Sequence, residues 1–334
     1  MAIAITAPIK TGLISDGLLP CVGCQTTRPI QRPVLRANGR TLPFDLHRCT
    51  ECGLVQQFPR ATAARLSAHY DSDYYVFKEE ERLRWSRAVQ QYCVHLRPME
   101  TRAPKRLLDV GCALGHMCAI AKRRGWRVSG LDLSAEAVSQ AVVRFGIDAR
   151  AGRISQYRST MPRFDAIMLG DVIEHVDDPA AFLKDVRNCL APGGVVCIDT
   201  PNWGGWWRRL GRSDWLGINP FHVNLFDARS IGTLLAKNGM RVESMTSYTH
   251  YRYGSLARRP EIQRLTRALP SAVVWRMNAV FSRFASLGRW AGLRTSQPAT
   301  LDEAMTALDR LSKKGAVPVG GKSGDNLAVL ARLV

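Results

Sequence analysis

A short run in the first half of the chain constrains the fold more strongly than any other feature. Residues 107–115 read LLDVGCALG, an apolar strand that ends in a carboxylate and a turn of small residues. The pattern then predicts a helix over 117–124 and a second strand over 126–131, which leads into Asp132 and Leu133. A strand, a helix and a strand in this order form a βαβ nucleotide-binding unit.

Small and acidic residues of this unit are suited to hold a nucleoside. Gly111 and Gly115 lack a Cβ atom, so the backbone can approach a ligand closely at both positions. Asp132 can accept hydrogen bonds from both hydroxyls of a ribose. The turn lacks the G-x-G-x-x-G pattern of dinucleotide-binding enzymes, and Asp109 would repel a pyrophosphate. A carboxylate at that position favours a ligand with a cationic head group.

The run resembles the first motif of class I S-adenosylmethionine-dependent methyltransferases, (D/E)-x-G-x-G-x-G, with Ala113 in place of the middle glycine. The resemblance implies a doubly wound α/β fold with a mostly parallel sheet, and S-adenosylmethionine as the cofactor. It also implies a set of residues that contact this cofactor: Asp109, Gly111, Cys112, Gly115, Asp132 and Leu133.

The segments after this unit continue the same resemblance. The pattern predicts strands over 164–171, 195–199 and 241–248, helices over 180–190 and 228–238, and a final strand over 326–334. That order is similar to the small-molecule branch of the class I family, which implies that Gly170 and Asp171 also contact the cofactor. Many members carry an acidic residue for the adenine amine after the third strand, whereas residues 151–154 read AGRI. We therefore expect adenine to be recognised by backbone groups or apolar walls.

Two C-x-x-C pairs near the N-terminus predict a metal site. The pairs are Cys21 with Cys24 and Cys49 with Cys52. Two such turns present four thiolates, which complete the tetrahedral shell of a zinc ion and leave no position open for a substrate. The alternative is two disulfides in an exported protein, but residues 1–20 lack the pattern of a secretory signal. We predict a zinc ribbon with a structural Zn²⁺, with His47 as a bystander, in a cytoplasmic protein.

Side chains after the fourth and fifth strands are candidates for activating an acceptor. Methyl transfer needs a base when the acceptor must lose a proton, and that base belongs beyond the carboxyl ends of these strands. Glu174 and His175 lie there, and His222 precedes the last helix of the core. The chain resembles zinc-bearing sugar methyltransferases, in which a Glu-His pair after strand four is implicated. His175 could instead cap the helix that follows, so its role stays open, as does the choice between the two histidines.

Charge and motifs limit the class of acceptor. The 47 basic and 28 acidic residues give a net charge of +19, which suits an anionic partner or reflects only an arginine-rich proteome. Amino-directed nucleic-acid methyltransferases usually need an N/D-P-P-Y/F loop after strand four, where this chain reads GDVI. Nucleic acid is therefore disfavoured as the substrate. We expect a small acceptor that is anionic or contains a sugar, such as a nucleotide- or lipid-linked glycan precursor in polysaccharide or secondary-metabolite synthesis.

Two other hypotheses fit the same chain. The first is an O-methyltransferase that acts on a quinone- or polyketide-like molecule. The second is an idle methyltransferase core that serves, through its zinc ribbon, as a binding module for RNA or protein. The intact Asp109, Gly111, Gly115 and Asp132 argue against the second hypothesis.

The remaining segments predict a linker and an insert around the core. We expect a zinc ribbon over 15–60, a helical linker over 61–100, the core over 101–250, a helical insert over 251–320 and the last core strand within 321–334. Tyr75 of the linker should fold over the cofactor. In the insert, residues 270–293 have the spacing of a basic amphipathic helix, which packs as a lid or subunit contact or lies on the inner face of a membrane.

Overall fold

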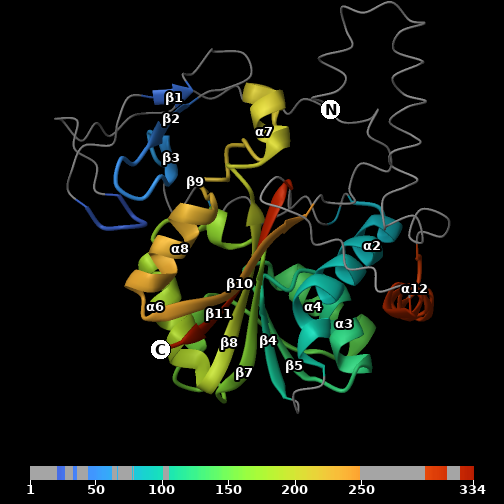
Figure 1. Cartoon of the computed structure of the whole chain (residues 1–334). Helices are drawn as coiled ribbons and strands as arrows, with labels where there is room; N and C mark the ends of the chain where they lie inside the picture. The colour runs from blue at the N-terminus through green and yellow to red at the C-terminus, as the bar shows by residue number, and fades with distance from the viewer. Residues whose placement is uncertain are drawn as a thin grey trace, which may run out of the picture.

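A seven-stranded sheet forms the centre of the protein (Figure 1). The computed structural model describes residues 21–26, 33–35, 44–61, 66, 77, 79–100, 105–248, 298–313 and 324–334. The strands in spatial order are β10 (Met240–Tyr248), β11 (Asn326–Leu333), β8 (Leu190–Pro201), β7 (Phe164–Gly170), β4 (Arg106–Val110), β5 (Arg127–Asp132) and β6 (Asp148–Ala151). β4 to β8 are paired in parallel, and β11 is antiparallel to both of its neighbours. The predicted doubly wound, mostly parallel sheet is confirmed.

Alternating side chains on the central strands build two apolar layers. Leu107 belongs to the same buried cluster as Trp85, whereas its neighbour Leu108 belongs to a second cluster with Leu183. The first face is covered by α2 (Glu81–Gln91), α3 (His116–Arg123), α4 (Ala135–Phe145) and α12 (Leu301–Lys313) (Figure 1). The second face is covered by α6 (Pro179–Cys189) and α8 (Ala228–Lys237). The short α5 (Ile154–Tyr157) lies on the same face, because Ile154 belongs to the same buried cluster as Leu183 of α6. Both faces of the sheet are therefore buried, as a parallel sheet requires.

Polar residues fix where the helices of the core begin. The Ser134 hydroxyl accepts a hydrogen bond from the Ala137 amide (3.3 Å) at the start of α4. The Asp178 carboxylate accepts from the amides of Ala180 and Ala181 (3.1 and 3.0 Å) at the start of α6. These caps satisfy amides that have no partner within the helix. β8 starts at Leu190 rather than at the predicted 195, because Leu190 already pairs with Phe164 across a register shift.

A second, four-stranded sheet joins the cysteine-rich segment to the core. Its antiparallel strands are β1 (Pro33–Leu35), β2 (Asp45–Arg48), β3 (Val55–Phe58) and β9 (Asn224–Leu225). The first three follow one another in the N-terminal segment, but β9 comes from the loop between β8 and α8 (Figure 1). The ribbon therefore shares its sheet with a segment of the core.

The linker and the insert are described only in part. The linker contributes α2, a π-helical turn over Tyr92–Leu96 and a 3₁₀ turn over Arg97–Met99, which pack against the sheet. Tyr75 and residues 270–293 lie outside the described residues, and α12 is the part of the predicted insert that is described. Within the described part of the chain, no helix has both the length and the apolar character needed to span a bilayer.

Candidate active site

The turn after β4 is shaped by residues in the left-handed backbone region. Gly111 and Gly115 have φ angles of 81° and 80°. A Cβ atom on Gly111 would lie 2.5 Å from Cγ2 of Val172, so this position has no room for a side chain. Ala113, which replaces the family's middle glycine, adopts φ 47°. That conformation costs a residue with a Cβ atom about 1–3 kcal/mol.

Asp132 holds this turn and also lines a cavity. Its Oδ2 accepts a hydrogen bond from the Ala113 amide (2.8 Å), and its Oδ1 accepts from the Ser134 amide (2.9 Å). Burial raises the pKa of the Asp132 carboxyl, while the amides of Ser134, Ala113 and Leu133 lower it. A carboxylate has about four acceptor sites, so Asp132 can still accept a ribose hydroxyl beside these amides.

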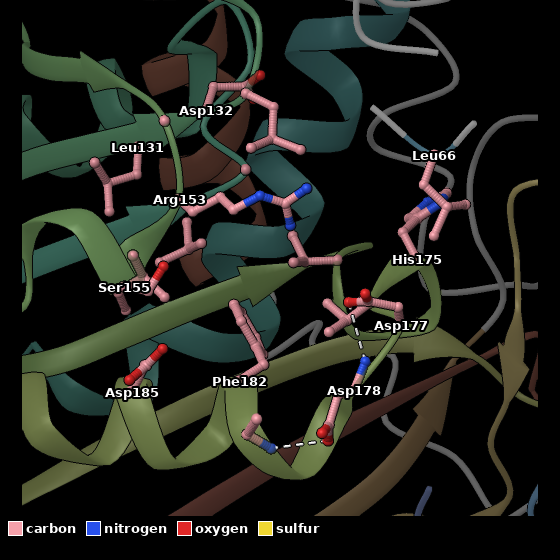
Figure 2. Close-up of a pocket in the computed structure, with 18 residues that line it drawn as sticks. Leu66, Leu131, Asp132, Arg153, Ser155, His175, Asp177, Asp178, Phe182 and Asp185 are labelled. Carbon is pink, nitrogen blue, oxygen red and sulfur yellow. Dashed lines mark hydrogen bonds between the residues drawn. The ribbon is translucent and has the colours of Figure 1, made fainter. Parts of the chain in front are cut away.

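The cavity beside Asp132 has a volume of ≈ 220 Å³. Its walls include Leu133, Ile154 and Phe182, which offer apolar surface, and the glycine backbone at Gly152. Figure 2 shows Arg153 reaching across the cavity between Asp132 and His175. The apolar walls suit an adenine ring, and Asp177, Asp178 and Asp185 add further carboxylates to the lining of the cavity.

A second pocket of ≈ 90 Å³ lies on the other side of the same turn. It shares Gly111 and Val172 with the first cavity, so the two flank the carboxyl end of β4. Its walls also contain residues that the sequence assigned to the cofactor: Asp109, Cys112, Gly170 and Asp171. Ligands of open α/β sheets bind at this edge.

Asp109 gives the second pocket its negative side. The carboxylate is 5% exposed and accepts a hydrogen bond from the Cys118 thiol (3.2 Å). Burial raises the pKa of Asp109 to about 7, and the Cys118 contact opposes the shift only in part. A cationic ligand group would supply the counter-charge that favours the carboxylate form.

Two arginines of α2 that sequence reasoning missed also line the second pocket. Arg84 donates to Glu81 (2.9 Å), and Arg87 is paired with Glu79. Glu81 in turn accepts from His116 of α3 (2.9 Å), which ties α2 to the core. The pocket therefore offers a carboxylate for a cationic group and guanidinium groups for an anionic one, a pairing suited to the two ends of an amino acid.

Glu174, His175 and His222 lie together at the edge of the first cavity. Each offers one ligand atom, and these atoms all lie within 4.8 Å of one another. The ring centroids of the two histidines are 4.6 Å apart at an interplanar angle of 83°. His175 lines the cavity, and α6 is capped by Asp178, so that cap does not require His175.

Backbone carbonyls determine how the two histidines are protonated. Nδ1 of His175 donates to the Phe221 carbonyl (3.1 Å), and Nδ1 of His222 donates to the Gly217 carbonyl (2.8 Å). A carbonyl oxygen can only accept, so in the neutral rings the lone pair is on Nε2. Both histidines therefore have the tautomer in which Nε2 can take a proton or bind a cation.

Glu174 is buried more completely than a group that meets a substrate directly. Its side chain is 0% exposed, and its Oε2 accepts a hydrogen bond from the Thr200 hydroxyl (2.9 Å). Burial raises the pKa of Glu174 well above its ordinary value, and the Asp171 charge adds to this shift. The sequence grouped Glu174 with the histidines, and its burial favours a supporting role behind them.

The ribbon holds the segment that carries His222. The Gln57 amide of β3 donates to the Val223 carbonyl (3.1 Å), and its side-chain Nε2 donates to the Pro220 carbonyl (3.4 Å). From the core side, Asn224 donates to the Val176 carbonyl (2.6 Å). The segment is thus fixed between β3 and the turn that contains Glu174 and His175.

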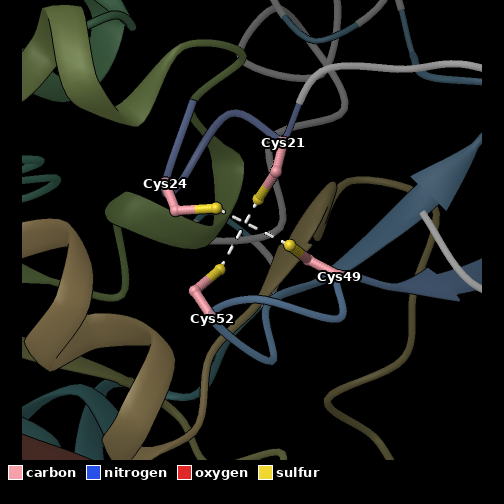
Figure 3. Close-up of side chains that lie close together, drawn as sticks. All are labelled: Cys21, Cys24, Cys49 and Cys52. Atoms are coloured by element: carbon pink, nitrogen blue, oxygen red, sulfur yellow. Dashed lines mark hydrogen bonds between the residues drawn. The ribbon is translucent and has the colours of Figure 1, made fainter. Parts of the chain in front are cut away.

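The four cysteines form a cluster whose dimensions fit zinc (Figure 3). The sulfur atoms of Cys21 and Cys52 are 3.6 Å apart, as are those of Cys24 and Cys49. Four sulfurs at about 2.3 Å from a tetrahedral zinc lie about 3.8 Å from one another. A disulfide would require about 2.05 Å. His47 contacts Asp45 and Phe58 and lies outside the cluster.

Comparison with known proteins identifies the core. Residues 77–245 match a family model described as a methyltransferase domain. The chain belongs to this methyltransferase family. The match covers the cofactor turn, the second pocket, the lining of the first cavity except Leu66, and the Glu174–His175–His222 cluster, and it excludes the cysteine cluster.

Individual members of the methyltransferase family match parts of the chain. It is 29% identical over 153 residues to a probable S-adenosylmethionine-dependent methyltransferase of Mycolicibacterium smegmatis, covering 44% of this chain and 56% of that protein. It is 30% identical over 168 residues to a ubiquinone biosynthesis O-methyltransferase of Parvibaculum lavamentivorans, covering 43% and 62%. The chain thus spans little more than half the length of these relatives. A solved S-adenosylmethionine-dependent methyltransferase from Archaeoglobus fulgidus is similar with a TM-score of 0.47 and 15% identity, covering 79% of this chain and 99% of that chain.

Proposed function

We propose that the protein transfers a methyl group from S-adenosylmethionine to a small acceptor that contains a sugar. The observation that carries this proposal is the succession of groups along one edge of the sheet. Asp109 and Asp132 lie on either side of Gly111, and His175 lines the same cavity as Asp132. This arrangement supports a cofactor held across the turn, with its reactive centre between the turn and the histidines.

The residues present fit the cofactor. Asp132 would hold the ribose hydroxyls, Gly152 and Ile154 would border the adenine, and the methionine end would lie between Asp109 and the two arginines of α2. Bound S-adenosylmethionine supplies a methyl group on a cationic sulfur. The chain's own contribution is alignment of the acceptor with that sulfur, and assistance when the acceptor must lose a proton.

His175 and His222 are the candidate groups for that proton. Their Nδ1 atoms donate to backbone carbonyls, which orients both rings with Nε2 as the basic nitrogen. Glu174, behind them, can stabilise an imidazolium if one forms. We assign the pair to the acceptor side of the site.

The sugar-type acceptor is supported by the cysteine-rich ribbon. The sequence resembles zinc-bearing sugar methyltransferases, and the ribbon contacts the segment that carries His222. Arg153 lines the cavity beside the carboxylates of Asp132, Asp177, Asp178 and Asp185, so the lining itself does not select an anionic acceptor. An O-methyltransferase of a quinone-like molecule is the second candidate, because curated relatives at about 30% identity carry the name ubiquinone biosynthesis O-methyltransferase.

Mass spectrometry of reaction products tests both candidates. Purified protein is incubated with S-adenosylmethionine and a panel of nucleotide sugars, lipid-linked sugars and catechol-type quinone precursors. A methylated sugar supports the first candidate, and a methylated phenol supports the second and overturns the first. Failure to bind S-adenosylmethionine would overturn both and favour a binding module with an idle core.

A further inference from the structure

We infer that Glu174, His175 and His222 bind a divalent first-row metal ion at the acceptor side of the site, separate from the cysteine cluster. This inference rests on the proposed function only for what the ion does, not for its binding. One carboxylate oxygen and two imidazole nitrogens lie within 4.8 Å of one another. Ligand atoms at about 2.0–2.2 Å from a common tetrahedral ion lie about 3.4 Å apart, so small side-chain rotations would complete the site.

The histidines are oriented in the way that metal ligands require. A metal-bound histidine generally donates its other ring nitrogen to a carbonyl or carboxylate, which fixes the tautomer and the ring plane. Here Nδ1 of His175 donates to Phe221 O and Nδ1 of His222 donates to Gly217 O. The ligand that is most distant in sequence, His222, lies in the segment that Gln57 and Asn224 hold in place.

Glu174 supplies an independent observation. The side chain is 0% exposed, and among the described residues its Oε1 has no hydrogen-bond partner. Within the part of the chain that the structure describes, no lysine or arginine forms an ion pair with Glu174. Leaving a buried polar atom without a partner destabilises the folded state. A bound cation would satisfy this oxygen and offset the nearby charge of Asp171.

The ligand set indicates both the class of ion and its use. Two imidazoles and a carboxylate suit zinc, iron, cobalt or manganese, whereas magnesium and calcium prefer oxygen ligands alone. Three protein ligands leave a coordination position open, in contrast to the closed four-cysteine shell. Since His175 lines the cavity that contains Asp132, an ion at this site would lie beside the proposed cofactor cavity.

An ion at this position would activate an acceptor hydroxyl. Coordination lowers the pKa of a bound hydroxyl, so its proton leaves to solvent and the oxygen keeps its electron pair. That oxygen then forms the bond to the methyl carbon as the carbon–sulfur bond breaks. In this arrangement the Nε2 lone pairs of the two histidines bind the ion. The histidines then promote proton loss by holding the ion that acidifies the acceptor hydroxyl, rather than by taking the proton themselves.

Cobalt titration of the full chain, with zinc already bound at the cysteine cluster, tests the site. Added Co²⁺ should give visible bands without the charge-transfer absorption of a cobalt–thiolate bond. H222A and E174Q should each weaken this binding more than tenfold. The control is H47A, which removes a histidine outside the cluster and should bind Co²⁺ like the wild type. Unchanged thermal unfolding would show that the variants are folded.

Two results would overturn the inference: cobalt that enters only with thiolate bands, or H222A that binds it like the wild type. Loss of turnover on chelation, restored by Co²⁺ or Zn²⁺ in the wild type but not in H222A, would support the role of the ion. Full turnover in protein shown to lack an ion at this site would overturn that role while leaving methyl transfer intact. Failure to bind S-adenosylmethionine would instead refute the proposed function and leave the cobalt result standing.

Discussion

Replacing Asp132 by alanine should weaken S-adenosylmethionine binding without unfolding the protein. The carboxylate makes two kinds of contact: it accepts backbone amides of Ala113 and Ser134, and it has lone pairs left for the ribose. Hydrogen bonds to a charged group contribute about 1.5–3 kcal/mol. If the ribose contacts are worth that amount in total, the dissociation constant rises about 10- to 150-fold.

Calorimetric titration of wild-type and D132A protein measures the change, with thermal unfolding recorded on the same samples. D185A is the matched control, because Asp185 lines the same cavity but is paired with Arg158. That variant should bind the cofactor within about threefold of the wild type. A folded D132A protein with wild-type affinity would refute the assignment of Asp132 to the ribose.

Four further outcomes are expected. Protonation of Asp109 competes with binding of a cationic ligand. The affinity for S-adenosylmethionine should therefore fall up to about tenfold per pH unit below the Asp109 pKa of about 7, and much less in D109N. Calorimetry between about pH 5.5 and 8 measures this change. Because the pKa of Asp109 is raised in the folded protein, the folded state holds this proton more tightly than the unfolded chain does. In the ligand-free protein, the resulting contribution to the free energy of unfolding is fully present below the pKa of Asp109 in the unfolded chain and is lost as the pH rises through about 7. C49S should lose the zinc of the cysteine cluster in metal analysis and become less soluble, while S-adenosylmethionine binding persists; reduced wild-type protein without zinc would contradict the ribbon. H175A or H222A should lower turnover about 10²–10⁴-fold with little change in cofactor affinity. Near-normal turnover in both variants across about pH 6–9 would instead indicate an acceptor that needs no histidine base, such as an amine.

The residues that hold the cofactor could be predicted from the sequence because they lie close together in the chain. A single βαβ unit places the Gly111 turn and Asp132 side by side, since Gly111 and Cys112 donate to the Leu131 carbonyl (2.7 and 3.0 Å). Once the strand order is known, the carboxyl ends of parallel strands bring Asp171 to the same edge.

The acceptor half depends on contacts that no local pattern encodes. His175 and His222 meet because β3 of the ribbon pairs with β9, which is far from it in the chain. Arg84 reaches the second pocket only because Glu81 and His116 tie α2 to α3. In the sequence, the arginines of α2 have the spacing of an ordinary exposed helix face. Their position beside the second pocket depends on how α2 packs against α3, which the sequence pattern does not specify.

Titration of the full chain with S-adenosylmethionine tests the central claim most directly, because the proposed chemistry begins with that cofactor between Asp109 and Asp132. We predict saturable binding of one molecule per chain, weakened about 10- to 150-fold in D132A and retained in D185A. The absence of binding heat at any concentration, in protein that unfolds cooperatively on heating, would contradict the proposed methyl transfer.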